Sequence, residues 1–146
     1  MIVVDDVGYN LERAERLLNL PGKLTLGLLP FAPHSPAIAK RAKLEGKEII
    51  LHQLMESIAA RQVPAEPGTL TMKMSAANFN QHFSEALAAV PFAVGVNNHS
   101  GSLLTQHRVP MDRLMQTIAA RGMFFLDSRT TPKTVALATA LTKPEI

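Results

Sequence analysis

The chain has 146 residues, of which 47% are hydrophobic and 18% charged, a balance typical of one folded globular domain. Its formal net charge is +3, its 15 basic residues are scattered, and only 5% of residues are aromatic, so a nucleic-acid-binding protein is disfavoured. The absence of cysteine excludes a disulfide framework and thiol chemistry. No apolar run approaches the roughly 20 residues that span a bilayer.

Five short runs rich in apolar residues alternate with segments whose apolar residues recur at helical spacing. The runs cover residues 2–4, 24–29, 48–51, 92–96 and 123–126. Their apolar residues are nearly continuous, which is typical of strands that are buried on both faces. We therefore predict five strands.

The segments that follow these strands predict helices that begin at a capping residue or a proline. The expected starts are Asn10, Pro36, Ser75, Pro110 and Pro132. Residues 53–74 interrupt this alternation, because they form an irregular stretch that is long enough to be a functional loop.

Strands that alternate with helices predict an α/β fold with a parallel sheet, either open or closed into a barrel. In such folds, functional residues gather at the carboxyl ends of the strands. Four of the five predicted strands end at a titratable or metal-ligating side chain. These side chains are Asp5 and Asp6, His52, His99, and Asp127.

Each of these residues also has a purely structural interpretation. Asp5 and Asp6 resemble hydrated turn caps, and a lone histidine such as His52 is more often a hydrogen-bonded core residue than a ligand. His99 is predicted to lie in a polar turn, where Gly101 allows the backbone to approach a ligand. Taken together, two histidines and two carboxylates supply the mixed nitrogen and oxygen ligands that zinc and similar divalent ions accept.

Three further histidines are predicted to lie outside this group. His34 lies in a proline-rich turn and His107 lies several residues beyond the fourth strand, so both are expected at the rim of the site. His82 is expected to be solvated or structural on the helix that begins at Ser75.

Five segments carry a resemblance to a known family. They are VDDVGYN at 4–10, LPFAP at 29–33, LHQLME at 51–56, VGVNNHSGS at 94–102 and FLDSRT at 125–130. On these segments the chain resembles the divergent polysaccharide deacetylases. The resemblance implies an incomplete, distorted (β/α) barrel of parallel strand-helix repeats. Residues 1–146 are expected to be a single catalytic-type domain whose parent protein continues beyond both ends.

The resemblance also implies roles for individual residues. In the wider deacetylase group the first Asp of a pair is the base and the second binds the metal, which implies Asp5 as base and Asp6 as ligand. Residues 46–52 align with the stretch that supplies the first metal histidine, which implies His52. The second histidine of the group lies four residues later, where this chain has Glu56. The third ligand is therefore Glu56 or His99, and His99 is favoured because its own strand delivers it.

The remaining residues of these motifs are expected to orient the ligands or to contact substrate. They are Asn98, Ser100, Asp127 and Arg129. The implied activity is the removal of acyl (N-acetyl) groups from an amino-sugar polysaccharide, as part of carbohydrate metabolism, with a divalent metal that is expected to be zinc. Relatives of this kind imply the periplasm or cell envelope. The first residues already read as a strand, so we expect any signal segment to belong to a longer precursor.

Two other functions compete with this one. A non-catalytic glycan-binding or scaffolding remnant of a deacetylase is favoured by Glu56 and by the expected lack of the strands that close the barrel. A metal-dependent phosphoesterase is disfavoured, because no cluster of basic residues adjoins the predicted site.

Overall fold

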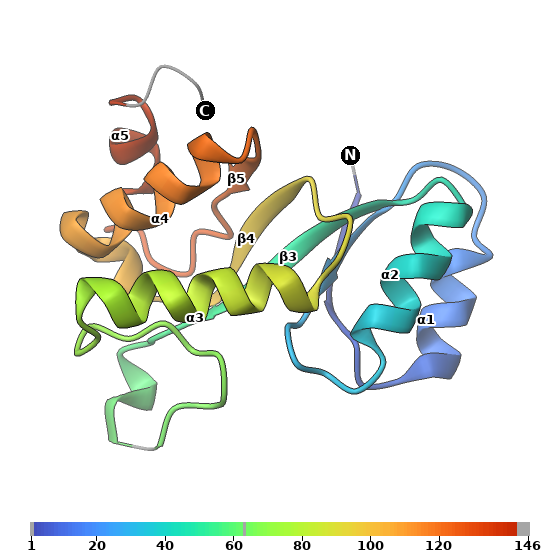
Figure 1. Cartoon of the computed structure of the whole chain (residues 1–146), viewed down its shortest axis with the longest axis horizontal. Helices are drawn as coiled ribbons and strands as arrows, with labels where there is room; N and C mark the ends of the chain where they lie inside the picture. The colour runs from blue at the N-terminus through green and yellow to red at the C-terminus, as the bar shows by residue number, and fades with distance from the viewer. Residues whose placement is uncertain (1, 63, 143–146) are drawn as a thin grey trace.

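A computed structural model describes residues 2–62 and 64–142, which form a parallel β-sheet with helices packed against it (Figure 1). Its strands are β1 (Val3–Val7), β2 (Thr25–Leu28), β3 (Glu48–Met55), β4 (Gly95–Ser100) and β5 (Phe124–Leu126). All four neighbouring pairs are parallel, and the strand order β1-β2-β3-β4-β5 follows the chain. The predicted α/β fold with five parallel strands is confirmed.

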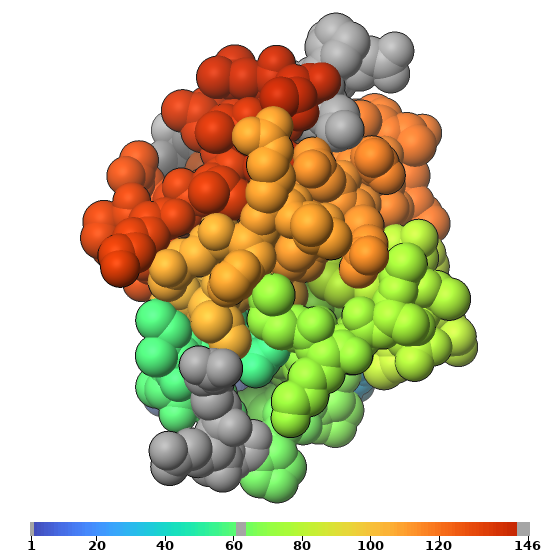
Figure 2. All heavy atoms as spheres, turned by 90° about the vertical axis from the view of Figure 1, so that its left-hand side faces the viewer, coloured from blue at the N-terminus to red at the C-terminus, as the bar shows by residue number. Residues whose placement is uncertain are grey.

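The sequential strand order explains where the helices lie. The helices are α1 (Leu11–Leu18), α2 (Ser35–Leu44), α3 (Ala76–Ala89), α4 (Arg108–Ala120) and α5 (Ala136–Ala140), with short 3₁₀ turns at η1 (Ala59–Gln62) and η2 (Leu104–Gln106). Right-handed crossovers between successive neighbours place the connecting helices on one face of the sheet. This is the arrangement of a (β/α) barrel, here with β1 and β5 as edges. Helix α4 packs against both α3 and α5, and Figure 2 shows α5 in red, α4 in orange and α3 in yellow-green on one side of the molecule.

Two predicted helix starts are confirmed by their capping hydrogen bonds. The side chain of Asn10 accepts from the backbone N–H of Arg13 at 2.9 Å, and Ser75 Oγ accepts from the N–H of Asn78 at 3.2 Å. Such caps satisfy backbone donors that a helix leaves unpaired in its first turn. Among the described residues, no helix is long and apolar enough to cross a membrane.

Two other predicted starts were wrong. Helix α4 begins at Arg108 and not at Pro110, which is accommodated in the first turn because its missing N–H has no helical partner there. Helix α5 begins at Ala136 and not at Pro132. The N–H of Val135 instead donates to the carbonyl of Thr105 at 2.8 Å, so a tertiary contact fixes where this helix starts.

The two central strands extend further than predicted. Strand β3 continues to Met55, and β4 begins at Gly95 and continues through Ser100. The added residues pair with each other, from His52 opposite Asn97 to Met55 opposite Ser100. Paired backbone groups satisfy one another, which outweighs the weak strand propensity of the polar residues. His99 therefore lies in a strand, and its predicted position in a polar turn was wrong.

The alternation of side chains along β3 separates the core from the site. Ile49, Leu51 and Met55 belong to the hydrophobic core that joins the sheet to buried helix residues such as Phe79. Because successive strand residues point to opposite faces, His52 points to the face of the sheet away from this core. The position of the site follows from this face and from the carboxyl ends of the strands.

Candidate metal centre

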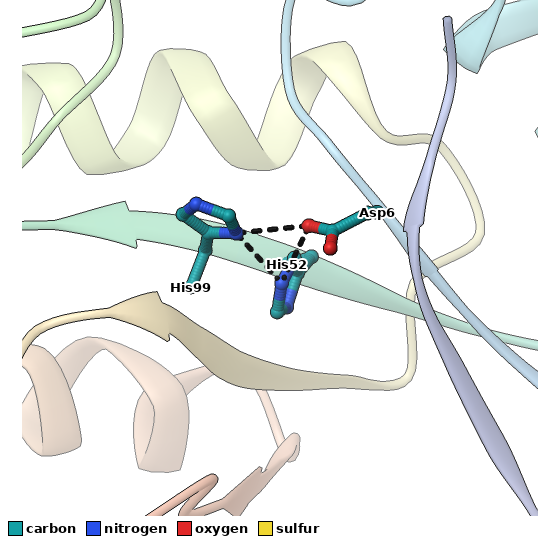
Figure 3. Close-up of side chains that lie close together, drawn as sticks. All are labelled: Asp6, His52 and His99. Carbon is teal, nitrogen blue, oxygen red and sulfur yellow. Dashed lines mark hydrogen bonds and ion pairs between the residues drawn. The ribbon is translucent and has the colours of Figure 1, made fainter. Parts of the chain in front are cut away.

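Three side chains from three strands converge on one point. Figure 3 shows Asp6 from β1, His52 from β3 and His99 from β4 directed toward one another. Asp6 Oδ1 lies 2.9 Å from His99 Nδ1 and 3.3 Å from His52 Nε2, and the two ring nitrogens are 3.1 Å apart. Among the described residues, these three form the group whose ligand atoms lie close enough together to hold a metal ion.

The spacing of these three atoms fits a small divalent cation. Ligands at about 2.0–2.1 Å from a tetrahedral zinc ion lie about 3.3 Å from one another, close to the separations observed here. The chemistry of the donors agrees, since two imidazole nitrogens and a carboxylate oxygen form a common zinc set that is also used by non-haem iron. Three acceptor atoms this close need a shared proton or a cation between them.

Asn97 fixes which nitrogen of His52 faces the metal position. Its side chain is buried, and its Nδ2 donates to Asp5 Oδ1 at 3.0 Å. An ionised carboxylate only accepts hydrogen bonds, so the amide nitrogen must face Asp5 and the amide oxygen must face His52. That oxygen lies 2.8 Å from His52 Nδ1, which therefore carries the proton. Nε2 is left with a lone pair directed at the metal position.

The backbone of β1 explains how adjacent aspartates reach one site. Consecutive strand residues normally point to opposite faces, yet Asp5 Oδ1 lies 3.5 Å from His52 Nδ1 while Asp6 Oδ1 lies 3.3 Å from His52 Nε2. The register of β1 against β2 shifts between Val4 and Val7, and Asp6 has a φ of 60°. A left-handed residue costs about 1–3 kcal/mol, and such strain collects at functional sites.

Gly27 in β2 provides the space for the Asp5 carboxylate. A Cβ atom at this position would collide with Asp5 Oδ1, so any larger residue would displace that side chain. Glycine inside a strand often marks such a close approach. The carboxylate is thus confined between Gly27 and the amide of Asn97.

Two of the other predicted site residues, Asn98 and Ser100, contact the loop after β5. Asn98 Oδ1 accepts from the N–H of Ser128 at 2.9 Å, and Asn98 Nδ2 donates to the carbonyl of Ser100 at 2.8 Å. Asp127 Oδ1 accepts from the N–H of Arg129 at 2.9 Å, which closes a local turn. The Asn98–Ser128 bond, together with a bond of 2.8 Å from the Thr130 hydroxyl to the Ser100 carbonyl, holds the loop after β5 against the end of β4. Among the described residues, Asn98, Ser100, Asp127 and Arg129 make no hydrogen bond or ion pair with the side chains of Asp6, His52 or His99.

The structure brings His99 to the candidate centre and places Glu56 elsewhere. Glu56 Oε2 accepts from the N–H of Met72 at 2.7 Å, and the Glu56 carbonyl accepts from the N–H groups of Leu103 and Leu104. Glu56 lines a cavity of about 360 Å³ without His99 and also one of about 120 Å³ that includes His99, but its carboxylate is not among the three converging ligand atoms. Of the two ligands left open by the sequence, the geometry favours His99. His34, His82 and His107 are likewise outside the group among the described residues.

Asn97 and Gly27 were missed from the sequence. Asn97 lies two residues before His99, so a strand extended through this stretch would have placed both side chains on one face. No sequence pattern points to Gly27, because the space that it leaves for the Asp5 carboxylate depends on how β1 and β2 are paired.

We expect Asn97→Leu to weaken zinc binding about 10- to 100-fold, the usual effect of removing a group that orients a metal ligand. Leucine has a similar size but cannot accept from His52 Nδ1. Zinc competition against a chromophoric chelator measures the affinity, and long-range ¹H–¹⁵N spectra report the His52 tautomer. Asn80→Leu on the exposed side of α3 is the matched control. Equal affinity in a folded Asn97→Leu variant would contradict the assigned role.

The fold and the site define a parallel α/β protein with a candidate metal centre at the carboxyl ends of its strands. Comparison with known sequences is more specific, since a family model described as divergent polysaccharide deacetylase matches residues 2–143. The chain belongs to this family, which confirms the resemblance inferred from its motifs.

Individual relatives extend this comparison. The chain is 38% identical over 135 residues to an uncharacterized protein of Haemophilus influenzae, and 34% identical over 139 residues to the uncharacterized protein YibQ of Escherichia coli K12. These matches cover 92% and 95% of this chain, but 48% and 43% of the relatives. The chain therefore spans about half the length of these curated relatives.

A solved structure shows the same fold. The crystal structure of the uncharacterized protein ATU2773 from Agrobacterium tumefaciens C58 superposes with a TM-score of 0.90 and 23% sequence identity. The match covers 97% of this chain and 58% of that protein. The likeness supports the arrangement of the strands and helices and carries no information on activity.

Proposed function

We propose that this chain holds the metal centre of a zinc-dependent hydrolase that removes acyl (N-acetyl) groups from an amino-sugar polysaccharide of the cell envelope. The observation that supports the proposal is the convergence of Asp6, His52 and His99 with the Asp5 carboxylate beside them. Three protein ligands of this kind leave an open coordination position, as catalytic zinc sites require. Membership of the deacetylase family supports the substrate class.

Asp5 is the proposed general base. Both described contacts of its carboxylate, from Asn97 Nδ2 and His52 Nδ1, are made at Oδ1, so Oδ2 remains for a proton from the attacking water. A divalent ion held by Asp6, His52 and His99 would supply Lewis acidity, which polarises an acyl carbonyl and acidifies a water. The water oxygen forms a C–O bond with the acyl carbon as Asp5 takes its proton, and the amide C–N bond then breaks as that proton passes to the departing amine.

Asn97 and His52 hold this arrangement in place. Asn97 is buried and bonded to both Asp5 and His52, so the base and one ligand cannot move independently. His52 is itself buried, with 3% of its surface exposed. A preorganised site of this kind needs little rearrangement during the reaction, which is the main source of catalytic advantage in many enzymes.

Release of acetate that depends on zinc tests the proposal. The chain is stripped of metal by chelation, and β-1,4-linked N-acetylglucosamine oligomers are added with and without one equivalent of zinc. We expect acetate release with zinc that is at least about 100-fold faster than without it. Saturable oligomer binding with no acetate release at any metal content would overturn the proposal in favour of a non-catalytic glycan-binding module.

A further inference from the structure

Two exposed aromatic rings border a small cavity near the metal centre. Tyr9 follows β1 and is 64% exposed, and Phe31 follows β2 and is 50% exposed. Both line a cavity of about 100 Å³ together with Leu54, Glu66 and Pro67. Large exposed aromatics side by side are unusual unless they contact a partner or ligand.

The Phe31 ring packs against the backbone of Gly68, which is itself held by a buried side chain. Gly68 lies directly against the ring, since a Cβ atom at Gly68 would come within 2.6 Å of it. The carbonyl of Gly68 accepts from Nε2 of Gln53 at 2.9 Å, and Gln53 is fully buried in β3. The ring is therefore held in an exposed position by contacts that reach the centre of the sheet.

The loop that holds Tyr9 is tied to the loop that holds Phe31. The N–H of Leu29 donates to the carbonyl of Val7 at 2.9 Å, and the N–H of His34 donates to the carbonyl of Gly8 at 3.0 Å. These bonds immobilise the chain directly before Tyr9 and on both sides of Phe31. Preorganised rings lose little conformational freedom when they bind a ligand.

The backbone of Phe31 shares an unusual feature with residues around the metal centre. Its φ is 62°, in the left-handed region, and Asp6, Ser100 and Arg129 have similar values at or after the carboxyl ends of β1, β4 and β5. Strained residues cluster at functional sites. Among the described non-glycine residues, Phe92 is the other one with a positive φ, and it lies before β4 at the opposite end of the sheet.

The cavity beside the aromatic rings adjoins a second cavity that reaches the metal centre, because the two share lining residues. Leu54 and Glu66 line it and also line a second cavity of about 120 Å³, which includes His99 and Ser100. A ligand that extends from the cavity of His99 into the adjoining one would pass Glu66, which lines both, and would reach Phe31.

We propose that Tyr9 and Phe31 bind a pyranose ring of the polysaccharide, next to the sugar whose acyl group lies at the metal centre. This inference rests on the proposed function. The C–H face of a pyranose ring is apolar and packs on aromatic rings, while its equatorial hydroxyl and amide groups seek polar partners. The exposed carboxylate of Glu66 supplies such an acceptor at the junction of the two cavities.

Intrinsic fluorescence tests this subsite directly. Tyr9 is the one tyrosine of the chain, and tryptophan is absent, so tyrosine emission reports this position. We expect a saturable change in emission when metal-free chain is titrated with the β-1,4-linked trimer of N-acetylglucosamine. Phe31→Ala is expected to weaken trimer binding about tenfold, equivalent to the loss of one aromatic contact.

Phe92→Ala is the matched control, because Phe92 has nearly the same exposure (51%) and φ (66°) as Phe31. It should bind the trimer like the unaltered chain. Tyr9→Leu, followed by calorimetry, is an independent second variant and should also weaken binding. Circular dichroism verifies that each variant is folded.

The outcomes separate this inference from the proposed function. Weaker binding in Phe31→Ala but not in Phe92→Ala supports the subsite, even if zinc-loaded chain releases no acetate and the deacetylase proposal fails. Acetate release from the trimer with equal trimer affinity in the unaltered, Phe31→Ala and Phe92→Ala chains would overturn the subsite and leave the deacetylase proposal intact. No trimer binding at millimolar concentration would also overturn it.

Discussion

Replacing His52 with alanine is expected to abolish stoichiometric zinc binding. His52 Nε2 is one of three converging donor atoms, and two remaining ligands hold zinc far more weakly than three. We expect a loss of affinity well beyond the roughly 100-fold caused by removing a group that merely orients a ligand. Elemental analysis after dialysis measures the bound zinc, and competitive zinc titration measures the loss of affinity.

Controls must separate loss of the ligand from loss of the fold. His52 is buried, and its removal leaves the Asn97 oxygen without its donor, which costs about 1–3 kcal/mol of stability. His99→Ala removes a more exposed ligand and should abolish zinc binding with a smaller loss of stability. His82→Ala removes an imidazole from α3 and should change neither the zinc affinity nor the stability of the fold. Unchanged zinc titration in His52→Ala would remove the basis of the proposed centre.

The fold was largely predictable because its signals are local. Nearly continuous apolar runs predicted the strands, and the caps at Asn10 and Ser75 fixed two helix starts. The errors occur where tertiary pairing decides the structure. The polar residues around Asn97 have low strand propensity, yet they extend β4 because β3 offers them a complete hydrogen-bonding partner.

The sequence could predict that side chains at the strand ends lie near one another, but not the geometry of the candidate site. Parallel strands bring their carboxyl ends together, which grouped Asp5, Asp6, His52, His99 and Asp127, and the family resemblance then selected three of them as ligands. The shift in register at Asp6 and the close approach of Asp5 to Gly27 depend on how two strands lie against each other. The sequence could not decide between His99 and Glu56 as the third ligand. In the structure the Glu56 carboxylate accepts a hydrogen bond from the backbone N–H of Met72, in the loop that follows β3.

Asp5→Asn is expected to lower the rate of acetate release by about 10²- to 10⁴-fold while leaving zinc affinity nearly unchanged. The substitution removes the proposed base but keeps the shape of the side chain. The new amide oxygen can still accept from Asn97 Nδ2, so Asn97 keeps its orientation and continues to hold His52. Asp6, His52 and His99 are not altered.

Measuring the rate of acetate release and the zinc affinity on one preparation distinguishes a base from a ligand. Asp6→Asn is the informative partner, because an amide is a much poorer zinc ligand than a carboxylate and this variant should lose both metal and activity. If Asp5→Asn instead lost zinc and Asp6→Asn retained it, the roles of the adjacent aspartates would be reversed. If Asp5→Asn kept full activity, proton transfer would have to occur at another group, and the confinement of Asp5 by Asn97 and Gly27 would be structural.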